Sequence, residues 1–234
     1  MTNDGFFERL KTEYELCRVL SQKNGCRVLL MNNRKLNKKL VLRLYKNEIP
    51  AYSFFKGIVF ENLPVIYDVY KTDDGQAVLE EYIDGVTVAE VLESGKYTYR
   101  GMKTVVSAVC DALDIIHKNG FIHRDVKPEN IIIDKNGTVK LIDFNASRIY
   151  KNTASSDTEV LGTVGYAAPE QLGISQTDSR ADIYALGVLI NVMLTQRHPS
   201  ECLADGRAGK TVLKCTSIDP AARFQSALAV KSAL

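Results

Sequence analysis

The sequence predicts an α+β protein with two lobes, a small β-rich lobe at about residues 1–82 and a larger helical lobe at about residues 83–234. Short runs rich in Val, Leu, Ile and Tyr, separated by polar turns, indicate strands in the first part. Apolar residues at helical spacing indicate helices in the second part. The composition, 45% hydrophobic and 25% charged residues, is that of an ordinary globular protein.

The strand-like runs of the first lobe are expected to pair as two hairpins. Residues 27–31 and 39–45 form the first hairpin, around a polar turn that contains Asn32 and Asn33. The runs LPVIYDVYK and QAVLEEYI form the second, and the Asp-Gly step between them suits a tight turn. The first lobe should therefore be mainly antiparallel sheet.

The second lobe is expected to contain two main helices and a short hairpin. The first helix follows apolar residues at intervals of three and four, and Asn119-Gly120 stops it: Met102, Val105, Val106, Val109, Leu113 and Ile116. Next, IIID and TVKLID flank a KNG turn and form the hairpin. Residues 181–195 are apolar nearly all round, which is typical of a buried helix. The lobes should meet near residues 82–85, where a ligand cleft is expected.

The charge balance gives no sign of a nucleic-acid or membrane partner. The 30 Lys and Arg residues nearly match the 28 Asp and Glu residues, so a nucleic-acid or membrane partner is not expected. The sequence has no apolar run long enough for a membrane span and no signal-peptide core at its start, so a cytoplasmic location is expected. The five cysteines lack CxxC spacing, which argues against a zinc site or a disulfide framework.

Residues 123–130, HRDVKPEN, concentrate polar chemistry between apolar runs, and we call them the polar loop. Asp125 and Asn130 lie in this loop, and Asp143 ends the following hairpin. Hard oxygen ligands from two neighbouring segments suit a magnesium ion bound to phosphates. A carboxylate there could accept a hydroxyl proton, and Lys127 could neutralise a phosphoryl group in transfer. The alternative interpretation is a set of ordinary solvated loop residues.

Later motifs extend this pattern over nearly the whole chain. HRDVKPEN is followed by LIDFN, GTVGYAAPE, DIYALG and DPAARF, in the order in which these motifs occur in protein kinases. From about residue 14 to residue 234 the chain resembles a Ser/Thr protein kinase, most of all the compact bacterial members. The resemblance implies a two-lobed protein-kinase-like fold, a single kinase domain over residues 1–234, ATP and Mg²⁺ as cofactors, and a protein substrate with a Ser or Thr acceptor.

The resemblance also implies roles for residues of the second lobe. Asp125 would be the catalytic base and Lys127 the charge stabiliser, while Asn130 and Asp143 would bind magnesium and through it the nucleotide. Other residues would hold geometry without reacting: Glu170 and Arg223 as a buried ion pair, Asp182 on the backbone of the polar loop, and His123 stacked with Phe144. His117 and His198 are assigned no functional role.

The resemblance further implies that Arg124, next to Asp125, goes with control by phosphorylation of the activation loop, residues 145–164. Four residues there are candidate acceptors, including for autophosphorylation, because a phosphate could pair with Arg124: Thr153, Ser155, Ser156 and Thr158. The alternative is the ordinary Ser/Thr content of an exposed loop.

The first lobe departs from the family pattern at the glycine-rich loop that normally covers the nucleotide phosphates. Ser21, Lys23 and Cys26 stand where the three glycines belong, and Gly25 is one position off. Only glycine lets the backbone come so close to phosphate, so this lid is degenerate. Lys23 could supply a side-chain charge instead, or it could be a solvated hairpin tip.

A second departure is Arg43, which stands where the phosphate-binding lysine of the third strand belongs. Arginine keeps the charge but changes length and geometry. Strand parity turns Lys38 and Lys46 to the opposite face. The next helix carries Ala51 or Ser53 where the partner acid should be.

The hinge strand QAVLEEYIDG offers a substitute for that acid. By resemblance, Glu81 and Ile83 contact adenine through their backbones, and Glu80 is the gatekeeper. A charged gatekeeper lies beside the strand-lysine position, so we expect Glu80 to pair with Arg43 and to replace the missing helix acid.

A third departure is Asn145, which replaces the glycine after Asp143-Phe144. Asparagine tolerates positive φ better than most residues, so the turn and metal binding by Asp143 are expected to be retained. Little room for helices is expected between His198 and Asp219, as in a minimal kinase.

Three functions follow from these patterns. The first is an active ATP-dependent Ser/Thr protein kinase that transfers the γ-phosphoryl group to a protein hydroxyl. The second is a nucleotide-binding pseudokinase that acts as a switch or scaffold, which the substitutions in the first lobe favour. The third is a small-molecule kinase, against which the intact GTVGYAAPE segment argues.

Overall fold

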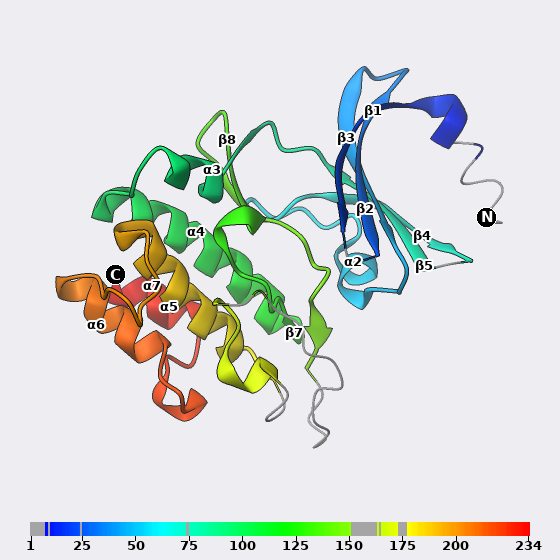
Figure 1. Cartoon of the computed structure of the whole chain (residues 1–234). Helices are drawn as coiled ribbons and strands as arrows, with labels where there is room; N and C mark the ends of the chain where they lie inside the picture. The colour runs from blue at the N-terminus through cyan, green and yellow to red at the C-terminus, as the bar shows by residue number, and fades with distance from the viewer. Residues whose placement is uncertain are drawn as a thin grey trace. The chain divides into compact units, whose positions relative to one another are not determined.

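A computed structural model describes residues 8, 10–23, 25–73, 75–150, 163, 165–172 and 177–234. The chain divides into two compact units (Figure 1). The first unit is Met1–Phe60 with Pro64–Asp84, and the second is Glu61–Leu63 with Gly85–Leu234. The first unit is mainly sheet and the second mainly helix, as the α+β prediction requires.

The first unit is built on an antiparallel sheet, whose strands, among the residues described, run in the order β1-β2-β3-β5-β4. The strands are β1 (Tyr14–Lys23), β2 (Cys26–Asn33), β3 (Lys38–Tyr45), β4 (Ile66–Thr72) and β5 (Gly75–Glu81). Helix α2 (Pro50–Phe55) connects β3 to β4, with proline in its first turn, where the missing amide proton costs nothing. Both expected hairpins are confirmed, as β2–β3 and β4–β5.

The turn of the first hairpin was predicted at the wrong residues. Asn32 and Asn33 belong to β2, where they pair with Lys39 and Lys38. The side chain of Asn33 accepts hydrogen bonds from the backbone amides of Lys35 and Leu36, at 3.1 and 2.9 Å. An asparagine side chain can thus organise the turn that follows it while its own backbone stays in the strand.

The two faces of this sheet are covered differently. On one face, Leu42, Ala77 and Leu79 pack with residues that include Leu10, which precedes β1. The opposite face carries Arg43 and Tyr45, because successive residues of a strand alternate between faces. The ring of Tyr45 lies 5.5 Å from that of Tyr52, so α2 packs on this second face.

The second unit is organised around α4 (Tyr99–Lys118) and α5 (Arg180–Thr195). The apolar stripe predicted for α4 is buried, and α5 is buried over most of its circumference, which confirms both helices. The expected hairpin is β8 (Ile131–Asp134) with β9 (Val139–Leu141), extended on the other side by β6 (Gly85–Thr87). Its remaining elements are short: α3 (Val88–Glu93), β7 (Phe121–Ile122), η1 (Pro128–Asn130), β10 (Arg148–Ile149), η2 (Pro169–Leu172), α6 (Gly206–Cys215), η3 (Pro220–Ala222) and α7 (Ala227–Ala233).

The segment between His198 and Asp219 holds one short helix. Helix α6 occupies ten of its residues and packs against α5. Gly187 makes this approach possible, because a Cβ there would lie 2.5 Å from the Cβ of Cys215. The close contact of two helices at a glycine is a packing feature that helical periodicity alone did not indicate.

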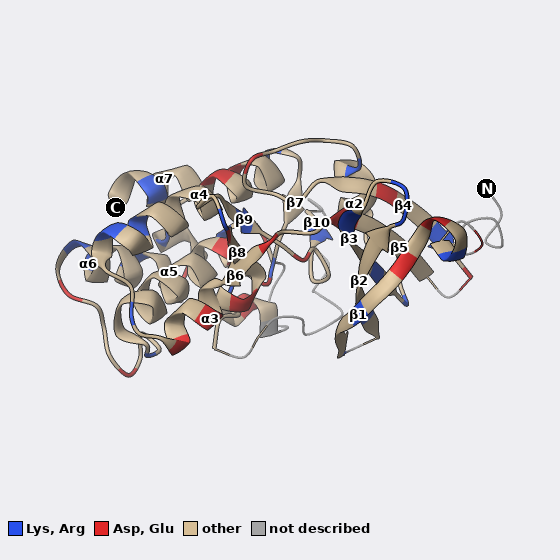
Figure 2. Ribbon diagram, turned by 90° about the horizontal axis from the view of Figure 1, so that it is seen from above, with Lys and Arg blue, Asp and Glu red and all other residues tan. Residues whose placement is uncertain are grey.

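Charged residues of both signs occur in each unit (Figure 2), in keeping with the net charge of +2. In the portion of the chain that the structure covers, no helix is both long enough and apolar enough to cross a membrane.

Candidate active site

The polar loop leaves β7 and runs into η1 and β8, and it brings three predicted site residues together. The Lys127 ammonium lies 2.8 Å from Asp125 Oδ2. Asn130 Nδ2 donates to the same Oδ2 at 2.8 Å and to the Asp125 carbonyl at 2.9 Å. Pro128 begins η1, and Asn130 ends it with its side chain directed at Asp125. The three residues therefore form one hydrogen-bonded cluster.

Thr163 completes this cluster, although it lies 38 residues away in sequence. Its hydroxyl donates to Asp125 Oδ1 at 2.7 Å and accepts from Lys127 Nζ at 2.6 Å. A hydroxyl group is thus held between a carboxylate and an ammonium. Thr163 lies within the GTVGYAAPE motif, but no local sequence pattern links it to Asp125.

The cluster keeps the Asp125 carboxylate ionised. Burial opposes the charged form, but hydrogen bonds from Lys127 and Thr163 outweigh burial and lower the pKa of Asp125 below its ordinary value. At neutral pH the side chain is therefore a carboxylate that can accept a hydrogen bond or a proton.

Asp182, in the first turn of α5, holds the backbone of the polar loop. Its carboxylate accepts from the amides of His123 at 2.9 Å and Arg124 at 2.7 Å, which confirms the contact predicted for it. Arg124 has φ of 68°, a conformation that costs free energy unless its surroundings impose it. Asp182 and Gln171, whose Nε2 donates to the Arg124 carbonyl at 3.0 Å, supply that constraint.

His117 is a residue whose role the sequence analysis missed. Its Nε2 lies 2.7 Å from Asp182 Oδ2, so the end of α4 is joined to α5 through this carboxylate. Burial raises the pKa of Asp182, but the bonds from His117 and the loop amides outweigh it, and the net pKa is lowered. His123, as expected, packs on Phe144, with ring centroids 5.8 Å apart.

Asp143 lies beside the polar loop because the backbone of the preceding residue, Ile142, contacts that loop. The Ile142 amide donates to the Asn130 carbonyl at 2.8 Å, and the Ile142 carbonyl lies 3.2 Å from His123 Nε2. The turn after it differs from the expectation, because the positive φ falls at Asp143 (72°) and not at Asn145. The Asn145 amide donates to Asp143 Oδ1 at 3.1 Å, and this side-chain turn takes the place of a glycine turn.

The donor set suits a magnesium ion. The side-chain nitrogen of Asn130 donates hydrogen bonds to Asp125, so the side-chain oxygen of Asn130 is the atom that could bind a cation. Asp143 adds a carboxylate from the adjacent segment. Magnesium takes one or two protein oxygens and completes its shell with water and phosphate. Over the described ranges, no group of three or more His, Cys, Asp or Glu side chains could hold a metal.

Arg43, on β3 of the first unit, is ion-paired with Glu80 on β5. Arg43 Nε lies 2.6 Å from Glu80 Oε1, and the two residues are only 5% and 2% exposed. The expectation that these side chains pair is confirmed. Ala51 is fully buried and Ser53 exposed on α2, which has no acidic residue along its length.

The two hinge positions differ in what they can offer a ligand. The Glu81 amide donates to the Val65 carbonyl at 2.8 Å, so this amide is already hydrogen-bonded within the first unit. The amide of Ile83 makes no backbone hydrogen bond within the part of the chain that is described. Glu81, Ile83 and Arg43 belong to the first unit, whereas the other predicted site residues belong to the second.

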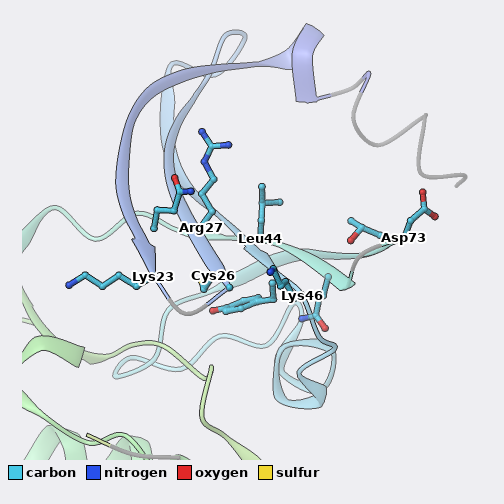
Figure 3. A pocket seen from close by; sticks show the side chains of 11 residues that line it. Lys23, Cys26, Arg27, Leu44, Lys46 and Asp73 are labelled. Carbon is cyan, nitrogen blue, oxygen red and sulfur yellow. The ribbon is translucent and has the colours of Figure 1, made fainter.

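The degenerate lid forms a hairpin that is paired up to its tip. Ser21 and Lys23 are strand residues of β1, Cys26 begins β2, and Lys23 pairs with Cys26. Gly25, with φ of 74°, occupies the turn. A cavity of about 940 Å³ lies at this end of the sheet (Figure 3). The lid residues Lys23 and Cys26 line it, together with Arg27 and Lys46, whereas Arg43, Glu81 and Ile83 do not.

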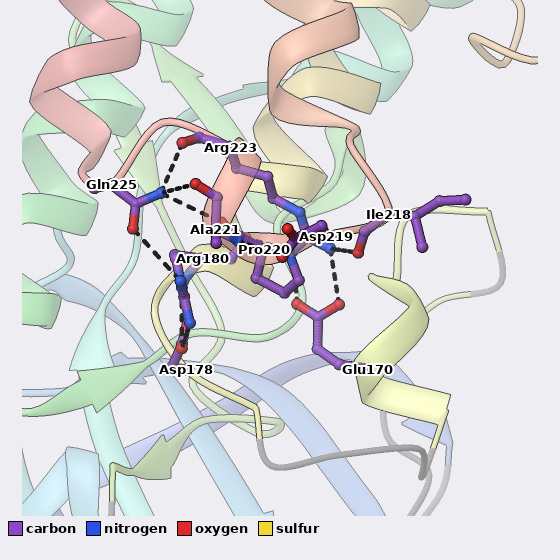
Figure 4. A network of polar contacts seen from close by, with 9 residues as sticks. All are labelled: Glu170, Asp178, Arg180, Ile218, Asp219, Pro220, Ala221, Arg223 and Gln225. Atoms are coloured by element: carbon purple, nitrogen blue, oxygen red, sulfur yellow. Dashed lines mark hydrogen bonds and ion pairs between the residues drawn. The ribbon is translucent and has the colours of Figure 1, made fainter.

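A buried ion pair supports the segment that follows Thr163. Arg223 Nη1 and Nη2 donate to the two carboxylate oxygens of Glu170 at 2.6 and 2.9 Å (Figure 4), as predicted. The same guanidinium donates to the carbonyls of Arg180, Ser217 and Ile218. The four candidate phosphoacceptors of the activation loop lie outside the described residues: Thr153, Ser155, Ser156 and Thr158.

Comparison with known proteins gives the family. The protein kinase domain family matches residues 20–226. The serine/threonine-protein kinase PknB of Mycolicibacterium smegmatis is 30% identical over 211 residues, which are 82% of this chain and 34% of that protein. PrkC of Bacillus subtilis is 30% identical over 209 residues, 82% of this chain and 32% of PrkC.

A third relative is the probable serine/threonine-protein kinase CPE1738 of Clostridium perfringens, 32% identical over 181 residues, 76% of this chain and 26% of that protein. This chain thus spans about a third of the length of such relatives or less. The predicted kinase-like fold and the predicted likeness to bacterial Ser/Thr kinases are both confirmed. The chain belongs to the protein kinase family.

Proposed function

We propose that this chain is an ATP-dependent Ser/Thr protein kinase that transfers the γ-phosphoryl group of ATP to a hydroxyl of a protein substrate. The observation that carries the proposal is the Thr163 hydroxyl, held 2.7 Å from Asp125 Oδ1 and 2.6 Å from Lys127 Nζ. An acceptor hydroxyl needs the same pair, a carboxylate to take its proton and a cation to balance the phosphoryl charge.

In this proposal each residue of the cluster has one task. Asp125, ionised at neutral pH, accepts the proton of the attacking hydroxyl and orients that oxygen. Lys127 stabilises negative charge on the phosphoryl group. Asn130 and Asp143 hold magnesium, which, when bound, neutralises the phosphates and positions them. Asp182 keeps the polar loop in shape without touching the substrate.

The nucleotide is proposed to bind through the first unit. The Glu81 carbonyl and the Ile83 amide are the candidate adenine contacts, and Arg43 is the candidate phosphate contact. A guanidinium binds phosphate through its planar fork, so charge compensation survives the loss of the usual lysine. The hairpin lacks glycine at Ser21, Lys23 and Cys26, which favours slower turnover than in a kinase with a glycine-rich lid.

The test is the intact mass of the protein and of a generic acceptor protein after incubation with magnesium-ATP. The wild type should add phosphate in steps of one phosphoryl group. Asp125→Asn should lower the rate about 10²- to 10⁴-fold, because it removes the base. Glu129→Gln is the matched control, since it removes an exposed carboxylate from the same loop, and it should react within about twofold of the wild type.

The remaining outcomes distinguish the alternatives. Nucleotide binding without phosphate transfer to any protein would contradict the proposal and favour a pseudokinase, which the substitutions at Arg43 and in the lid also support. Transfer to small alcohols but not to a peptide mixture would favour a small-molecule kinase. Peptide mapping of the wild type tests autophosphorylation in 145–164, and phosphate found only elsewhere would contradict it.

A further inference from the structure

The Arg43–Glu80 pair fixes the position of the Arg43 guanidinium, the proposed phosphate contact. Arg43 faces Val78 across the β3–β5 ladder, and Val41 faces Glu80, so the two side chains are diagonal neighbours on one face of the sheet. Their contact of 2.6 Å is nearly excluded from solvent. Glu80, a carboxylate that orients Arg43, therefore belongs to the sheet and not to a helix.

Helix α2 cannot supply a carboxylate that orients Arg43. It is six residues long, PAYSFF, and none of them is acidic. Ala51, Tyr52 and Phe55 are buried, and Ser53 and Phe54 are exposed. No movement of this helix could bring a carboxylate of its own to Arg43.

The helix is also tied to three strands of the sheet. Before it, the Ile49 amide donates to Gln76 Oε1 on β5 at 2.9 Å. Within it, the hydroxyls of Tyr52 and Tyr45 are 2.7 Å apart, which joins α2 to β3. After it, the Gly57 amide donates to the Ile66 carbonyl of β4 at 2.8 Å. These three hydrogen bonds hold α2 in a fixed position on the sheet.

Arginine suits this arrangement better than lysine. A guanidinium has five N–H donors in a fixed plane, and the bond to Glu80 runs through Nε. One arginine can therefore contact a carboxylate and a phosphate oxygen through different nitrogens. A lysine has one nitrogen, for which a buried Glu80 and the phosphates would compete.

We propose that Glu80 is the positioning residue for the phosphates of the nucleotide, acting through Arg43, and that phosphate binding in this kinase does not depend on the position of α2. The inference rests on the proposed function, because it takes Arg43 as the phosphate contact. It assigns control of that contact to the hinge strand β5, so regulation of this site has to act by a route other than displacement of α2.

The test compares the affinities for magnesium-ATP and for adenosine, which lacks phosphates, in a double-mutant cycle. Glu80→Gln should weaken ATP binding about tenfold and leave adenosine binding unchanged, since it weakens the contact that orients the Arg43 guanidinium. Arg43→Met should do the same. In the Arg43→Met background, Glu80→Gln should have no further effect on ATP affinity, because in this proposal Glu80 positions the phosphates through Arg43.

Tyr52→Phe is the matched helix control, because it removes the hydroxyl bond between α2 and β3 but keeps the aromatic ring. It should leave ATP affinity within about twofold. Thermal unfolding of every variant tests whether a loss of ATP affinity comes from loss of the folded state. An unchanged adenosine affinity shows that the nucleoside site is still intact.

If the wild type binds ATP more tightly than adenosine, two results would overturn this inference without contradicting the proposed function. One is equal loss of ATP affinity from Glu80→Gln in the wild-type and Arg43→Met backgrounds. The other is a tenfold loss from Tyr52→Phe. A wild type that binds ATP no better than adenosine would instead contradict the proposed role of Arg43, and the inference would fall with it.

Discussion

Asp182 is a single residue on which several contacts of the polar loop converge. One carboxylate satisfies two backbone amides, of His123 and Arg124, and contacts His117. Its side chain is fully buried, so removing it would leave amides without an acceptor in a place that water does not reach. Its contribution therefore belongs to stability as well as to geometry.

Asp182→Ala is expected to lower the free energy of unfolding by about 3 kcal/mol or more at pH 7. Because the pKa of Asp182 is lowered in the folded state, its stabilisation is present above the unfolded pKa of about 3.9 and is lost as pH falls through the folded pKa. Urea unfolding of wild type and variant between pH 7 and pH 3 measures this, and the difference should shrink at the acidic end.

Asp111→Ala provides the control for this series. Asp111 pairs with Lys231 where both side chains are partly exposed to solvent, so its removal should cost about 1 kcal/mol or less. A difference between wild type and Asp182→Ala that stays constant from pH 7 to pH 3 would contradict the assigned role of the carboxylate.

At the scale of elements, the hairpins of the first unit depend on glycine at one point. Gly75 begins β5 with φ of 144°, and a Cβ there would lie 2.2 Å from the Tyr45 carbonyl oxygen. The end of β3 thus lies in close contact with the start of β5. The same two strands carry Arg43 and Glu80, so their register bears on the proposed phosphate contact.

Gly75→Ala is expected to destabilise the fold by about 3 kcal/mol, because the methyl group clashes with rigid backbone and the φ is unfavourable. Gly57→Ala is the matched control, since Gly57 also has positive φ (74°) but no atom within 4 Å of the added Cβ among the described residues. It should cost about 1 kcal/mol. Equal shifts of the thermal midpoint in the two variants would show that the clash at Gly75 is relieved by movement of β3.

At the scale of the whole molecule, the segment after Thr163 is held by residues near the end of the chain. The side chain of Arg223 is fully buried and binds Glu170, 53 residues earlier, as well as three carbonyl groups. Figure 4 shows how this guanidinium joins segments that are distant in sequence. Such a pair contributes mainly by fixing one arrangement of the chain, since its burial offsets much of its attraction.

Arg223→Met is expected to lower the free energy of unfolding by about 3–5 kcal/mol, because it leaves the Glu170 carboxylate buried without its cation. The double variant Glu170→Met with Arg223→Met should recover part of this loss, since no charge is then stranded. Chemical denaturation of the two single variants and the double variant gives the coupling. Additive losses would contradict a direct interaction between the two side chains.

The sequence by itself determined the features that are encoded locally. Period-two and helical patterns gave the hairpins and the main helices, because the burial of one face leaves its period in the sequence. Asp125, Lys127 and Asn130 lie within eight residues, so their proximity followed from the motif. Strand parity and neighbouring strands were enough to pair Arg43 with Glu80.

Tertiary structure alone decided contacts between residues that are far apart in the chain. Thr163 reaches Asp125 across 38 residues and His117 reaches Asp182 across 65, and no periodicity records such pairings. It also decided that Asp143, and not Asn145, takes the positive φ, because side-chain hydrogen bonds can replace a glycine turn. Local patterns depend on which residues are buried, whereas these contacts depend on which buried surfaces meet.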